Sequence, residues 1–296
     1  MSNSSFPRKT FLVFLAPMML SNILQSLLGT INGAYLGQMI GVDALAAASV
    51  FMPVMFFFIA FVMGLSSGAS ILIGQAWGAG EPLKVKAVAG TTLSVALMIA
   101  TTIAILGGLF SRPFLAALAT PPDILDAASS YARIMMISMP LTFTFILWAA
   151  MMRGVGDSVT PLVALSVSAV IGLVATPALI RGWLGLPRLG VASAAWAGVI
   201  SGSITLILLH LYLRRRAHAL AIDVAFLRAM WPNGKLLRIV LRLGIPSALG
   251  IFPKRNLLRR AAFTVRREIV RVFNTRKSAN HILLLHWHTL VGSQAR

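Results

Sequence analysis

The side chains that could do chemistry in this sequence are neutral and lie inside long apolar stretches. They comprise amides, hydroxyls and one indole ring: Asn22, Gln25, Asn32, Thr142, Thr144 and Trp148. These groups can hold a ligand by hydrogen bonds or by an aromatic face, but none gains or loses a proton near neutral pH. Cysteine is absent, and the acidic residues of the first 213 positions all lie between the apolar stretches. Nucleophilic and acid–base catalysis therefore lack their reagents, so we predict a binding or transport protein with no enzymatic activity, metal or cofactor.

Six apolar stretches are long enough to cross a membrane as helices. Of the 296 residues, 58% are hydrophobic and 11% are charged, and the mean hydropathy is +0.86. A helix needs roughly 20 residues to cross about 30 Å of hydrocarbon. The expected spans are residues 10–31, 46–74, 87–110, 131–152, 160–181 and 191–213. The predicted fold class is an all-α integral membrane protein, built as a six-transmembrane-helix bundle.

Basic residues are concentrated at one end of this expected bundle. With the amino terminus in the cytoplasm, twelve basic residues fall on that side, from Arg8 and Lys9 to the run 214–216 and Arg242. The opposite loops and helix ends hold only four basic residues together with three aspartates. Loops rich in Lys and Arg stay in the cytoplasm. We therefore predict a multi-pass protein of the bacterial inner membrane with a cytoplasmic amino terminus.

Prolines and glycines are expected to shape the spans. Pro17, Pro53 and Pro140 each free a backbone carbonyl and bend the helix, which a membrane protein tolerates beside a partner or a cavity. Glycines four apart, such as Gly74 and Gly78, let two helices approach closely. Bent helices around a polar lumen are typical of a transporter.

The chain divides into three parts by composition. Residues 1–213 form the six-helix lobe, residues 214–250 a cytoplasmic linker and the start of a seventh helix, and residues 251–296 a basic tail. The apolar-Pro-small pattern around Pro17 returns around Pro246, which indicates that a second lobe begins there.

The tail holds ten basic residues and one acidic residue. One reading is a basic arm that binds anionic lipid or nucleic acid. The composition changes abruptly in mid-helix, however, which favours the product of a reading-frame shift after about Gly250. We expect no nucleic-acid partner.

Four segments, in order along the chain, resemble the multidrug and toxic compound extrusion family, and the likeness covers roughly residues 8–250. They follow the first expected helix, end the second, join the fourth to the fifth and precede the sixth: Gly37–Ala47, Gly68–Gly80, Arg153–Pro161 and Leu186–Ala197. The resemblance implies that the bundle is the amino-terminal lobe of a twelve-helix exporter.

The third of these segments also has a structural interpretation. Gly154 and Gly156 allow a tight reversal, Asp157 can accept hydrogen bonds from free amides of the next helix, and Pro161 suits its first turn. A gating role for Arg153 and Asp157 is the alternative.

The sequence departs from the family at its cation site. Aligned on Gly37, Asn32 takes the place of the aspartate near the end of the family's first helix. Gly172 and Thr176, before Pro177, take the places of an asparagine and an aspartate on its fifth helix. Neither Asn32 nor Thr176 can change charge. Either coupling resides in a second lobe, or it is lost.

The resemblance implies an antiporter that exports drugs and organic cations in exchange for sodium ions or protons, in contact with membrane lipids. The polar groups named first, with mobile methionines at Met18, Met19, Met135 and Met136, are the candidate lumen for lipophilic cations. The alternatives are a transport-inactive half-length fragment, which could self-associate, and a lipid-linked oligosaccharide flippase. A flippase would need several lumenal arginines to hold a pyrophosphate, and only Arg133 lies near an interior position.

Overall fold

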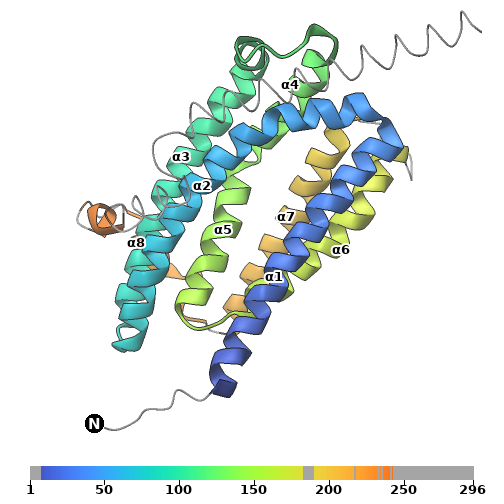
Figure 1. Cartoon of the computed structure of the whole chain (residues 1–296). Helices are drawn as coiled ribbons and strands as arrows, with labels where there is room; N and C mark the ends of the chain where they lie inside the picture. The colour runs from blue at the N-terminus through green and yellow to red at the C-terminus, as the bar shows by residue number, and fades with distance from the viewer. Residues whose placement is uncertain are drawn as a thin grey trace, which may run out of the picture. The chain divides into compact units, whose positions relative to one another are not determined.

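The described part of the chain folds as a bundle of long helices in the computed structural model (Figure 1). The structure describes residues 8–182, 190–216, 218–231, 234, 236–240 and 242, so the predicted tail and most of the predicted seventh helix lie outside the described residues. The elements are α1 (Arg8–Tyr35), the π-helical turn η1 (Leu36–Ile40), α2 (Val42–Gly78), α3 (Pro82–Ala117), α4 (Pro122–Ile137), α5 (Met139–Gly154), α6 (Val159–Arg181), α7 (Ala192–Arg215) and α8 (Val224–Ala229).

The all-helical membrane fold is confirmed. Within the described part of the chain, α2, α3, α6 and α7 are each long and apolar enough to span a bilayer, and α4 with α5 makes a fifth candidate as a bent pair. The 28 residues of α1 cover the first expected span. Both α2 and α3 are longer than predicted, at 37 and 36 residues, because their helices continue into the polar ends of the bundle.

The fourth expected span is not one helix beginning at residue 131. It begins at Pro122 and bends by 49° at Ser138, between α4 and α5. The cause is Pro140, which has no N–H to continue the helical ladder and whose ring crowds the preceding turn. The predicted bend is confirmed, while the predicted start was wrong by about two turns.

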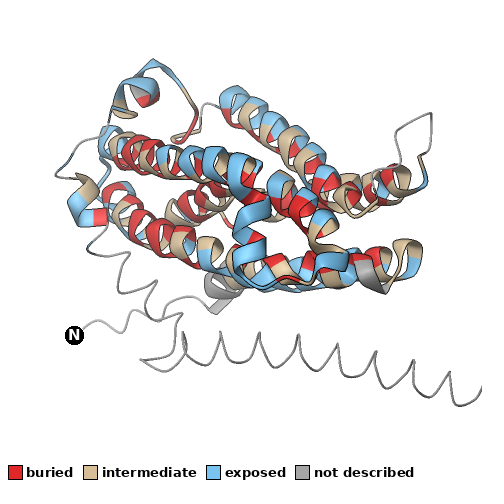
Figure 2. Cartoon of the chain, turned by 90° about the horizontal axis from the view of Figure 1, so that it is seen from above, coloured by how far each residue is buried: buried red, intermediate tan, exposed pale blue. Residues whose placement is uncertain are grey.

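Small residues bring α2 and α5 into close contact. A Cβ added at Gly154 would lie 2.8 Å from the carbonyl oxygen of Ser70, and one added at Gly74 would lie 3.2 Å from the carbonyl oxygen of Gly154. The expected close approach at Gly74 is confirmed, whereas Gly78 has open space around it. Figure 2 shows the buried residues gathered on the facing sides of the helices.

Candidate functional site

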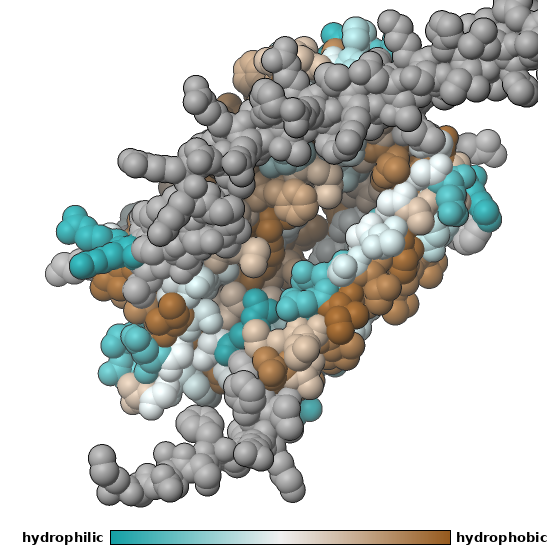
Figure 3. Space-filling view, in the orientation of Figure 1, coloured by the Kyte–Doolittle hydropathy of each residue, from teal (hydrophilic) through white to brown (hydrophobic). Residues whose placement is uncertain are grey.

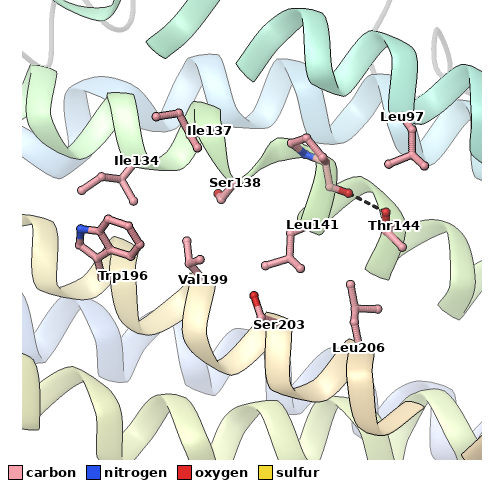
Figure 4. A pocket seen from close by; sticks show the side chains of 11 residues that line it. Leu97, Ile134, Ile137, Ser138, Leu141, Thr144, Trp196, Val199, Ser203 and Leu206 are labelled. Carbon is pink, nitrogen blue, oxygen red and sulfur yellow. Dashed lines mark hydrogen bonds between the residues drawn. The ribbon is translucent and has the colours of Figure 1, made fainter. Parts of the chain in front are cut away.

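One cavity lies where the bend at Pro140 opens space in front of α7. It has a volume of about 430 Å³ and is walled by α3, α4, α5 and α7. Figure 4 shows Leu97, Ile134, Ile137 and Leu141 on one side and Trp196, Val199 and Leu206 on the other. The polar groups in its lining are the hydroxyls of Ser138, Thr144 and Ser203. A mostly apolar wall with a few hydroxyls and one indole suits a lipophilic ligand.

The hydroxyls on α5 are held by their own helix. The Thr144 hydroxyl donates to the carbonyl of Pro140 at 2.6 Å, and the Thr142 hydroxyl donates to that of Ser138 at 3.2 Å. These carbonyls lie beside the bend. Both threonines therefore satisfy backbone acceptors there and keep their oxygen lone pairs for a ligand.

A second cavity continues from the first along α7. It has a volume of about 130 Å³, shares Thr144 and Leu206 with the larger cavity, and adds Trp148, Leu209, His210, Leu213 and Ile222. His210 is a lining residue that sequence reasoning missed. The available signal was an ionisable side chain within the sixth expected span, which by itself marks a position of functional interest.

Trp148 is buried at this inner end of the cavities. Its indole stacks on the ring of Phe226 from α8, with centroids 5.7 Å apart and planes 16° from parallel. Phe226 is fully buried. The predicted ligand face of Trp148 is thus covered by a residue from the segment predicted to be a linker.

The polar residues of α1 form a separate group. Asn22 and Gln25 are exposed, and α1 packs against α6 and η1. Figure 3 shows hydrophilic side chains along α1 beside a hollow between α1 and α2. The six predicted lumen residues therefore divide into an α1 group and an α5 group, with Thr144 and Trp148 in one cavity.

The two positions that lack the family carboxylates come together between α1 and α6. Thr176 is buried; its hydroxyl donates to the carbonyl of Gly172 at 2.8 Å and approaches the side-chain oxygen of Asn32 at 3.5 Å. A Cβ added at Gly172 would lie 3.7 Å from the hydroxyl of Ser201 on α7. The result is a cluster of neutral oxygens where the family resemblance implies carboxylates.

The turn between α5 and α6 is formed around Asp157 and Gly156. Asp157 accepts hydrogen bonds from the amides of Val159 and Thr160, at 3.1 and 2.9 Å. Gly156 has a φ of +88°, which glycine adopts without strain. Pro161 lies in the first turn of α6, and Arg153 in the last turn of α5.

Arg133, the arginine nearest the interior by sequence, is exposed on α4. Its Nε donates to the carbonyl of Gly108 at 2.8 Å, close to the kink in α3 at Phe110. It therefore caps a carbonyl of a bent helix and is absent from the lining of both cavities.

Comparison with known proteins finds multidrug resistance and export proteins among the relatives of this chain. The MatE family model matches residues 17–178. The chain is 40% identical over 239 residues to the probable multidrug resistance protein YoeA of Bacillus subtilis, covering 81% of this chain and 52% of the relative. It is 23% identical over 245 residues to the multidrug export protein MepA of Staphylococcus aureus, with the same coverage. The chain thus spans about half the length of the curated relatives it matches.

The solved structures agree in fold. An outward-facing multidrug resistance MATE family transporter of the MOP superfamily superposes with a TM-score of 0.71 at 26% identity, over 82% of this chain and 52% of the other.

Proposed function

Because this chain belongs to the MatE family, we propose that it supplies one lobe of a multidrug exporter that moves lipophilic or cationic small molecules out across the inner membrane. The observation that carries the proposal is the cavity at the Pro140 bend, with its apolar wall, three hydroxyls and Trp196. An indole face attracts organic cations, and the apolar wall accommodates varied carbon skeletons.

The proposed orientation has the amino terminus in the cytoplasm. The start of α1, the α2–α3 turn, the α5–α6 turn and the end of α7 lie at one end of the helices, as Figure 1 shows. That end carries the lysines and arginines predicted to be cytoplasmic.

Coupling to protons or sodium ions is proposed to depend on groups outside the Asn32–Thr176 cluster. The hydroxyl and amide groups of this cluster have no charge to change. A second lobe that supplies a titratable or cation-binding group would restore antiport; without one, the protein would be an uncoupled pathway.

Efflux of a fluorescent lipophilic cation tests the proposal. Cells expressing this chain alone would be compared with cells expressing the chain continued after Gly250 into a second six-helix lobe. We expect export by the longer form. Export by the 296-residue chain alone would favour self-association of two lobes, and export by neither form would contradict the multidrug proposal.

A further inference from the structure

The two cavities form a path that runs along one face of α7 toward its carboxyl-terminal end. Leu206, Leu209, His210 and Leu213 line it at helical spacing, one turn after another. The inner end of this path is lined by Ile222, which comes from the segment after α7.

The segment of residues 218–231, here called the plug segment, packs against the bundle at that end. Leu220 and Phe226 are fully buried, and Phe226 stacks on Trp148. Its helix α8 contacts α3 so closely that a Cβ added at Gly90 would lie 2.7 Å from the backbone of Ala229. A glycine at position 90 is therefore required for this contact.

Polar contacts hold the plug segment to α3. Asp223 accepts from the amide of Phe226 at 2.8 Å, which caps α8, and also pairs with Lys86. The hydroxyls of Ser94 and Thr91 donate to the carbonyls of Met230 and Ala229 at the other end of α8. Both ends of the short helix are thus fastened by hydrogen bonds and one ion pair, and all of these contacts are reversible.

We propose that the plug segment is a removable closure of the cavity path, and that Phe226 must leave Trp148 before the path opens to the cytoplasm. The assignment of this opening to the cytoplasmic side rests on the proposed orientation of the amino terminus. When Phe226 leaves, the covered face of Trp148 becomes available to a ligand. The closed arrangement seen here thus stops the path at the second cavity.

Cysteine labelling can test this closure without any transport assay, because the natural sequence contains no cysteine. Thr144→Cys places a single thiol where the two cavities meet. A membrane-impermeant thiol reagent is then applied to each face of sealed vesicles that contain the full chain. Lys84→Cys, in the exposed α2–α3 region, identifies the face with the α2–α3 turn.

Phe226→Ala is expected to speed labelling of Thr144→Cys about tenfold from the Lys84 face, which corresponds to a shift of roughly 1.4 kcal/mol toward the open form. The matched control is Leu227→Ala, because Leu227 is exposed on the same helix; it should leave the rate unchanged within about twofold. Equal rates for the two variants would overturn the proposal.

The ion pair between Lys86 and Asp223 allows a second measurement. Its expected result is a non-additive effect of two substitutions on the labelling rate, which misfolding of the variants would not produce. Asp223→Asn keeps a capping oxygen but loses the charge, and Lys86→Met removes the partner. Each single change should speed labelling, and the double change should be no faster than either single one. Additive effects would overturn the role of the ion pair. Labelling of Lys84→Cys from the outer face would contradict the orientation, while the Phe226 and Leu227 comparison would still decide the closure.

Discussion

Helix α1 and the block formed by α2, α3, α4 and α5 differ in how closely they are packed. In the block, added Cβ atoms at Gly154 and Gly107 would lie within 3 Å of neighbouring atoms, while at Gly29 and Gly33 on α1 nothing lies within 4 Å. The block also holds Trp148 and one wall of the larger cavity, whereas α1 packs mainly against α6 and η1.

This difference in packing density indicates which part of the lobe keeps a fixed shape. Packed interiors change little in shape, because every displacement creates a clash or a void. The wall of the Pro140 cavity that α3, α4 and α5 supply is therefore preformed, and α7 supplies the opposite wall. Helix α1 presents exposed apolar side chains such as Met19, Ile23 and Leu27 together with Asn22 and Gln25, so it is the element with room to repack.

The largest difference is expected when valine replaces one glycine in the block and one glycine on α1. Gly154→Val should destabilise the fold by about 3 kcal/mol, since overpacking forces α2 and α5 apart at the Ser70 carbonyl. Gly33→Val adds the same side chain to α1, where nothing lies within 4 Å of the added Cβ, and should change the stability by less than about 1 kcal/mol, because valine is no worse than glycine in a helix. Thermal unfolding in detergent, followed by circular dichroism, measures both. Equal losses would show that α1 is as tightly packed as the block.

A second test concerns the α1–α6 contact. Asn32→Asp places a carboxylate beside Thr176, and efflux by the exporting form should then vary with pH by up to about tenfold per unit, because one proton is bound or released. The control, Asn22→Asp, adds the same charge to an exposed position on α1. The same pH profile in both variants would assign the effect to charge alone.

A third test addresses the α5–α6 turn, which joins the rigid block to the pair α6 and α7. Asp157→Ala removes the acceptor for the Val159 and Thr160 amides and should cost about 1 kcal/mol. Asp157→Asn keeps a side-chain oxygen and should cost less. If the two variants unfold at the same temperature, the charge of Asp157, and not the cap, is what matters.

The smallest expected effect is a pH dependence of the plug segment. Burial lowers the pKa of His218, with Asp157 acting in the opposite direction. Its neutral Nδ1 accepts from the amide of Leu220 at 3.2 Å, a bond that protonation removes. Because the docked pKa is lowered, docking is at full strength above the ordinary pKa of about 6.5 and weakens as the pH falls below it.

Labelling of Thr144→Cys, normalised to Lys84→Cys at each pH, measures this dependence. The ratio should rise on acidification from pH 7.5 to 5.5 by less than about tenfold, and His218→Gln should flatten the profile. A ratio that falls on acidification would contradict the sign.

Much of the fold could be predicted because hydropathy and turn chemistry are local. The apolar lengths indicated an all-helical membrane bundle, Pro140 indicated the bend, and Asp157 with Pro161 indicated the cap and first turn of α6. The start of the fourth span was missed because residues 122–130 are too polar to resemble a span, and yet form the first turns of α4.

Sequence reasoning named Thr144 and Trp148 as candidates, and the structure places both in the lining of one cavity. It did not name Phe226 or Leu220, because nothing in the sequence places a linker residue against an indole far away in the chain. The contact of Asn32 with Thr176 spans 144 residues.

The amino-acid sequence alone indicated a helical membrane bundle, most of its turns, and six apolar stretches that contain no carboxylate. The packing of the helices was needed to show which side chains share a cavity and that the segment after α7 folds back over Trp148. The physical reason is that membrane helices are apolar on every side, so their sequence pattern does not reveal which face meets a neighbour and which meets lipid.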